Sequence, residues 1–107
     1  MQIKNAEITE TMLGLEGHGI FSFMIYLGFN KHSSQGFGGW VLGPGTDKFI
    51  KEVLKVVGVE KWEDLKGKAV RAAEEDGRLI GIGNLFEEQW FYPKDFFEKL
   101  KVANEEK

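Results

Sequence analysis

Apolar and polar residues alternate along the N-terminal part of the chain, and a period of two indicates β-strands. The alternation covers residues 3–15, 20–30 and 35–42, with polar turns between these stretches. Sequential strands joined by short turns predict an antiparallel meander. The residues that share one face of the middle strand are Phe21, Phe23, Ile25, Leu27 and Phe29.

The apolar spacing becomes helical after the break at Gly43-Pro44-Gly45. From Thr46, which we expect to cap the helix, apolar residues recur every three to four positions until Gly58, a typical C-terminal stop. Residues 59–65 predict a short second helix or turn. We expect these helical residues to pack on one side of the sheet.

A second pair of alternating stretches, residues 68–74 and 78–85, flanks a turn at Glu74–Gly77 that contains Asp-Gly, the strongest short hairpin signal. Pro93 suits the first turn of a short amphipathic final helix. The predicted fold is α+β: an antiparallel sheet, made of a meander plus a hairpin, covered by two or three helices. The 107 residues form one domain, 1–107.

Composition narrows the class of protein. The formal net charge of −3 argues against nucleic acid as the partner, because nucleic-acid binders usually present a basic surface. No apolar run approaches the ~20 residues of a membrane helix, and no signal peptide precedes the first strand. With no Cys and only two His, we expect no disulfide, metal or cofactor. The predicted location is the cytoplasm.

Catalytic residues are not evident in the sequence. There is no Gly-x-Ser-x-Gly elbow, and His18 lies between two glycines, where a turn residue is more common than a base. The acidic pairs lie in polar turns and are most simply solvated. The sequence therefore favours a binding protein over an enzyme.

The run Gln35-Gly36-Phe37-Gly38-Gly39-Trp40 combines glycines that leave the backbone open with rings that can stack on a flat ligand. Such a surface suits a nucleotide. The alternative is a glycine-softened strand whose aromatic side chains pack inward. The run matches no strong phosphate-binding motif.

A second candidate surface lies on the hairpin. Symmetric pairing places Arg71 near Gly81 and Gly83, whose strand face would be bare, so that the guanidinium could reach a phosphate. Asn84 offers a donor and an acceptor to a base or ribose, and Trp90 could stack. The alternatives are an exposed Arg71 paired with a neighbouring acid, and Trp90 in core packing or an oligomer contact.

Several short motifs together resemble a family of small phage and prophage proteins, the Thoeris anti-defence sponges. The motifs are Ile3-Lys4-Asn5-Ala6-Glu7-Ile8, Leu13-Gly14, His18-Gly19, the run from Gln35 to Gly39, Val56-Val57-Gly58-Val59, Trp62 to Lys68, Ile82-Gly83-Asn84-Leu85 and Trp90-Phe91. The resemblance implies non-catalytic binding of a cyclic ADP-ribose isomer, of the glyco-cyclic type made by bacterial TIR-domain defence enzymes, in the cytoplasm of the host cell. It also implies a homo-oligomer with sites between protomers. The predicted ligand-binding residues are His18, Gln35, Gly36, Phe37, Arg71, Gly83, Asn84 and Trp90.

The chain departs from this family at one place. Members carry a longer, arginine-containing segment where this chain has only Val41-Leu42-Gly43-Pro44, so Arg71, Arg78 or Lys48 would have to replace its phosphate contacts. Nine Phe and three Trp also exceed what one small core hides, which independently predicts a homodimer or larger assembly. The alternative function is a small inhibitor that docks on a partner protein through a sheet edge or through residues 90–92.

Overall fold

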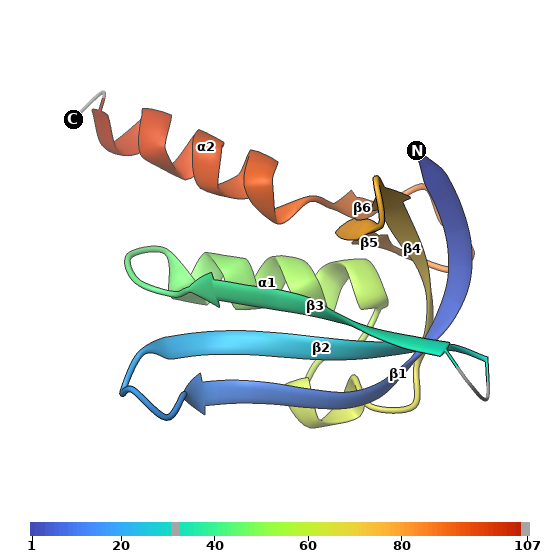
Figure 1. Cartoon of the computed structure of the whole chain (residues 1–107). Helices are drawn as coiled ribbons and strands as arrows, with labels where there is room; N and C mark the ends of the chain where they lie inside the picture. Colours follow the sequence, from blue (N-terminus) through green and yellow to red (C-terminus); the bar gives the residue numbers. More distant parts are fainter. Residues whose placement is uncertain (31–32, 106–107) are drawn as a thin grey trace.

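The computed structural model describes the backbone of residues 1–30 and 33–105, and the side chains there except those of residues 39–41 and 102–105. Its strands form one six-stranded antiparallel sheet in the order β3-β2-β1-β4-β5-β6 (Figure 1). The predicted α+β fold is confirmed. The elements are β1 Gln2–Leu15, β2 Phe21–Asn30, β3 Ser33–Val41, α1 Thr46–Val57, a 3-10 turn Trp62–Asp64, β4 Ala69–Glu75, β5 Arg78–Gly83, β6 Trp90–Phe91 and α2 Pro93–Glu105.

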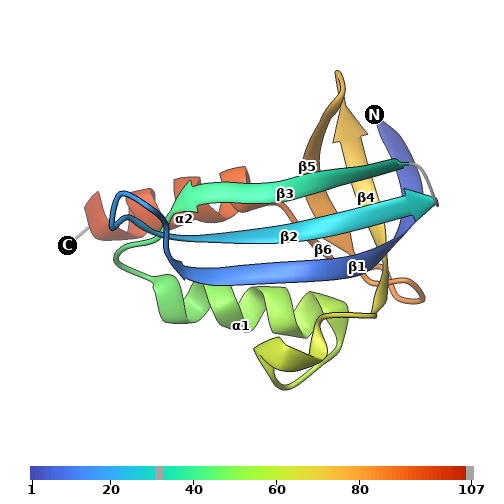
Figure 2. The same ribbon diagram turned by 60° about the horizontal axis from the view of Figure 1, so that its bottom comes forward.

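Strand β1 joins the two halves of the sheet. Its first residues, up to Glu7, pair with β4, and from Glu7 onward it pairs with β2. A register shift between Ile8 and Glu10 lies just after this change of partner, and bulges bend a strand and increase its twist. As a result, β4 and β5 cross the ends of the three long strands, and the sheet curves around α1 (Figure 2). One hydrogen bond connects the two ends of this curve. The side-chain amide of Gln35 on β3 donates to the carbonyl oxygen of Gly77, in the turn between β4 and β5, 3.0 Å away.

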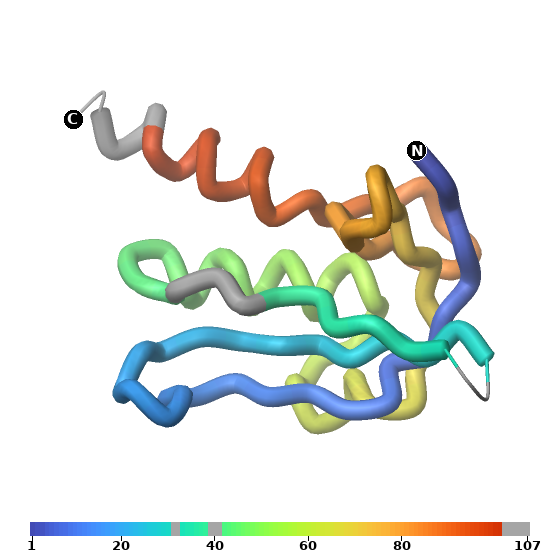
Figure 3. The backbone as a smooth tube through the Cα atoms, viewed as in Figure 1, coloured from blue at the N-terminus to red at the C-terminus, as the bar shows by residue number. Residues whose placement is uncertain are grey.

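The core lies inside this curve and is centred on Phe49 of α1. The Phe49 ring is fully buried, with its centroid 4.6 Å from that of Phe23 on β2 and 5.2 Å from that of Phe91 on β6. Helix α2 adds Phe96 and Phe97, each with a ring centroid 5.7 Å from that of Phe49. The backbone tube in Figure 3 shows α2 running beside α1, so that both helices converge near β6.

The ends of α1 differ in part from the sequence prediction. Gly58 ends the helix as predicted, with φ 90°. Thr46 is not the N-cap: Gly45 holds that position with φ 88°, and the Thr46 hydroxyl instead donates back to the Gly43 carbonyl oxygen. The tight entry leaves no room for a larger residue, because a Cβ on Gly45 would lie 2.6 Å from Leu100 of α2.

The β4–β5 hairpin turns at Asp76 and Gly77, both with positive φ (53° and 78°), as a two-residue Asp-Gly turn requires. The turn is thus shorter than the four residues predicted. Strand β6 was not predicted; it pairs Trp90 with Gly83 and Phe91 with Ile82. Within the described residues, no helix is long and apolar enough to span a bilayer.

Candidate functional site

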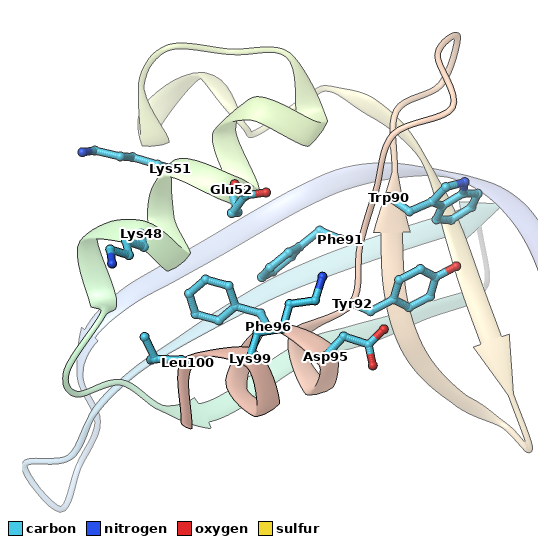
Figure 4. Close-up of a pocket in the computed structure, with 10 residues that line it drawn as sticks. All are labelled: Lys48, Lys51, Glu52, Trp90, Phe91, Tyr92, Asp95, Phe96, Lys99 and Leu100. Atoms are coloured by element: carbon cyan, nitrogen blue, oxygen red, sulfur yellow. The ribbon is translucent and has the colours of Figure 1, made fainter. Parts of the chain in front are cut away.

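A cleft of about 560 Å³ opens between α1, α2 and the segment that links β6 to α2 (Figure 4). Aromatic residues line this cleft, and lysines border it. Its lining residues are Lys48, Lys51 and Glu52 from α1, Trp90, Phe91 and Tyr92 from β6 and its end, and Asp95, Phe96, Lys99 and Leu100 from α2.

The helical period explains the lysines. Lys48 and Lys51 are one turn apart on α1, whose opposite face buries Phe49 and Val53 in the core. Lys99 comes from α2 on the other side of the cleft, and in Figure 4 it reaches towards Phe91. Three ammonium groups against the carboxylates of Glu52 and Asp95 leave the lining with a net positive charge.

The rings of Trp90 and Tyr92 point away from the two helices (Figure 4) and cover the two glycines of β5. The rings of Trp90 and Tyr92 are stacked, with centroids 6.0 Å apart and planes 21° from parallel. A Cβ on Gly83 would lie 2.6 Å from the Trp90 ring, and a Cβ on Gly81 equally close to the Tyr92 ring. The expectation of a bare glycine face is therefore wrong. The missing side chains make room for the protein's own rings, so a ligand cannot reach Gly83 from that side.

Arg71 lies opposite Gly83 in the β4–β5 register, as predicted, but its guanidinium is occupied within the protein. Nε donates to the Asn84 carbonyl oxygen (2.7 Å), Nη2 to the Glu87 carbonyl oxygen (2.9 Å) and Nη1 to the Glu88 carboxylate (2.9 Å). The alternative of pairing with an acid is the one observed, although the acid is Glu88. Hydrogen bonds from Arg71 and from the Trp90 indole lower the pKa of the Glu88 carboxyl.

Asn84 is likewise committed to the local structure. Its amide nitrogen donates to the Val56 carbonyl oxygen at the end of α1 (3.0 Å). Its side-chain oxygen accepts from the backbone N–H groups of Phe86 and Glu87, both at 2.9 Å. This pattern is an Asx-type turn, which shapes the loop between β5 and β6.

The remaining predicted ligand residues lie apart from the cleft. Phe37 is 1% exposed and packs edge-on against Phe23, so for this ring the inward-packing alternative is correct. Gly36 lies on the opposite face of β3, beside Met24, so glycines and ring do not form one surface. Gln35 is used in the bond to Gly77 described above.

His18 lies in the turn between β1 and β2, where its Nδ1 is 3.3 Å from a Glu16 carboxylate oxygen. That turn is at the opposite end of the long strands from β6 (Figure 1). The structure thus gathers four predicted residues, Arg71, Gly83, Asn84 and Trp90, and separates them from the rest. Trp40, in the glycine-aromatic run, has its side chain outside the described part of the structure.

Tyr92, Lys51 and Lys99 were not among the predicted ligand-binding residues. Lysines on the polar face of a helix look like ordinary solvated charges, and only the packing of α2 beside α1 brings these lysines to the border of one cleft. Lys48 was predicted only as one of three residues that could replace the phosphate contacts of the arginine-containing segment, which is shorter in this chain.

A second hollow, of about 990 Å³, lies on the other side of Tyr92 and shares Asp95 with the cleft. Its other charged residues mix the two signs: Arg78 and Lys94 with Glu75 and Asp76. The cleft is thus the hollow whose charge favours an anion.

No protein-family model, no curated protein and no solved structure matches the chain.

Proposed function

We propose that this protein binds an anionic nucleotide-type ligand in the cleft between α1 and α2 and holds it without converting it. The observation that carries the proposal is the cleft itself, which is lined by the aromatic residues Phe91 and Phe96 and bordered by Lys48, Lys51 and Lys99. Together with the resemblance of the sequence to the anti-defence sponges, this chemistry favours a cyclic ADP-ribose isomer. The biological role would be to remove an immune signal made by a TIR-domain enzyme in the bacterial cytoplasm.

The lining supplies the two kinds of contact that a nucleotide needs. Lysine ammonium groups donate charge-assisted hydrogen bonds to phosphate oxygens, and aromatic faces stack on a base. Small-molecule sites commonly have volumes of about 300–1,000 Å³, and the cleft, at about 560 Å³, lies within that range.

The two helices that frame the cleft are held in place before any ligand arrives. The Phe96 and Phe97 rings of α2 each have a centroid 5.7 Å from that of Phe49 on α1. Because a fixed frame loses little conformational entropy on binding, preorganisation of this kind raises affinity. Tight binding is the property that sequestration requires.

Isothermal calorimetry with cyclic ADP-ribose isomers, cyclic mononucleotides and uncharged adenosine tests the proposal. We expect a cyclic ADP-ribose isomer to bind and adenosine to bind far more weakly. The double variant Lys51→Glu/Lys99→Glu should lose about tenfold to a hundredfold in affinity, the value of a charge-assisted contact. Lys66→Glu/Lys68→Glu, the matched control, makes the same change of charge at two exposed lysines away from the cleft and should bind normally.

Chromatography of the recovered ligand tests the second half of the proposal. We expect the ligand to leave the denatured protein with unchanged mass and retention. A processed product would overturn sequestration, and equal affinities of the two double variants would overturn the cleft as the site.

A further inference from the structure

The loop between β5 and β6, residues 84–89, presents a phenyl ring to solvent. The Phe86 side chain is 91% exposed, more than any other large apolar residue in the described part of the chain. The loop projects beyond the ends of β5 and β6 (the orange loop in Figure 2). A large aromatic side chain at such a tip contributes nothing to the core, and aromatic residues are enriched where proteins contact one another.

The loop is held rigidly in this shape. The Asn84 N–H donates to the Gln89 carbonyl oxygen (2.9 Å) and closes its base. Inside it, the Asn84 side chain accepts from two backbone N–H groups and Arg71 holds the Glu87 carbonyl oxygen, as described above. The exposure of Phe86 is therefore a property of an ordered loop, and an ordered loop can dock with little loss of entropy.

The charges beside Phe86 indicate the chemistry of the surface it fits. Glu87 and Glu88 follow directly and are exposed, and one Glu88 carboxylate oxygen is bonded to Arg71. An apolar ring followed by acidic groups is complementary to an apolar recess with cationic groups at its border. Complementary charges favour the encounter and fix the orientation of two surfaces.

The chain itself carries such a recess. The cleft between α1 and α2 is lined by Phe91 and Phe96 and bordered by Lys48, Lys51 and Lys99. We infer that Phe86 of one copy docks in this cleft of a second copy, with its acidic neighbours facing the lysines. Each copy has both parts.

Docking would also regulate the proposed function. Since Phe86 and an anionic ligand would occupy the same cleft, ligand should compete with self-association; this consequence, unlike the docking itself, rests on the proposed function. Self-association is measured without ligand. Ligand affinity is measured on Phe86→Ser, whose own cleft is intact. Failure of one proposal is thus distinguishable from failure of the other.

Sedimentation velocity of the full chain, from about 1 to 200 μM, tests the docking. We expect the wild-type protein to associate reversibly and Phe86→Ser to weaken association about tenfold or more, as for a central aromatic anchor. Leu15→Ser is the matched control, because Leu15 is also apolar and 72% exposed but lies at the other end of the long strands. A monomeric wild type, or equal association of Phe86→Ser and wild type, would overturn the inference.

Mixing two variants then identifies the contact. Phe86→Ser lacks the ring but keeps the cleft, whereas Lys51→Glu/Lys99→Glu keeps the ring and has a reversed border. We expect each variant alone to associate weakly and the mixture to form a heteromeric complex, seen as a rise in anisotropy of one labelled component. If the mixture associates no better than the variants alone, Phe86 does not dock in the cleft.

Discussion

The Arg71 guanidinium lies against the face of the Trp90 ring, 4.6 Å from its central carbon to the ring centroid. This contact connects β4 to β6 across the intervening strand β5. On the far side of the ring is Gly83, so the indole is held between a cation and a backbone. Arg71 thus holds the Trp90 ring over β5, and its three hydrogen bonds shape the loop that carries Phe86.

Replacing Arg71 should therefore affect stability. Arg71→Ala removes three hydrogen bonds made by a side chain that is only 20% exposed, and we expect the free energy of unfolding to fall by about 2–3 kcal/mol. Urea denaturation measures this change. Arg78→Ala, at an exposed position on β5, is the control and should change it by about 0.5 kcal/mol or less. Equal stabilities of the two variants would show that the Arg71 contacts contribute nothing to stability.

A side chain at Gly83 should displace the Trp90 ring. In Gly83→Ala the new Cβ would lie 2.6 Å from this ring, so the ring must move, at a cost of about 1–3 kcal/mol of stability. Tryptophan fluorescence should shift towards a more exposed indole. Gly14→Ala is the comparison, because a Cβ there meets nothing within 4 Å. Unchanged fluorescence in Gly83→Ala would contradict the described seat of Trp90.

The Glu88 carboxyl should respond to acid in a defined direction. Its pKa is lowered from the ordinary 4.5, first by the hydrogen bond from Arg71 and then by that from the Trp90 indole. A lowered folded-state pKa means that the ion pair stabilises the loop at neutral pH, and that this contribution is lost as the pH falls through the folded-state pKa. Carboxyl NMR titration should place Glu88 below 4.5 in the wild type and nearer 4.5 in Arg71→Ala. A Glu88 midpoint that is the same in both proteins would exclude Arg71 as the cause.

Local signals were sufficient for most of the fold. The alternation over residues 20–30 buries Phe23, Ile25 and Leu27 completely, and the Asp76-Gly77 turn forms because both residues adopt positive φ. Strand β6 has only two residues, too few for a periodic pattern. Without its register, in which Trp90 faces Gly83, nothing in the sequence shows that a ring covers the glycine face.

The candidate site was less predictable, for a related reason. Arg71 and Asn84 carry the polar groups expected of ligand contacts, and the same groups satisfy a local loop. Whether these groups bind a ligand or the loop depends on the path of the loop through Glu87 and Glu88, which the sequence does not reveal. The lysines of the cleft lie on two helices far apart in sequence, and only the packing of Phe96 and Phe97 against Phe49 brings those helices together.

The backbone amide resonances provide the most direct test of the cleft as a ligand site. Phe96 lines the cleft, whereas Trp62 lies in the 3-10 turn before β4 and serves as an internal control. On titration with a cyclic ADP-ribose isomer, we expect the Phe96 amide resonance to shift with saturation and that of Trp62 to stay in place. Saturable binding that leaves the Phe96 resonance unmoved would show that the ligand site is not this cleft.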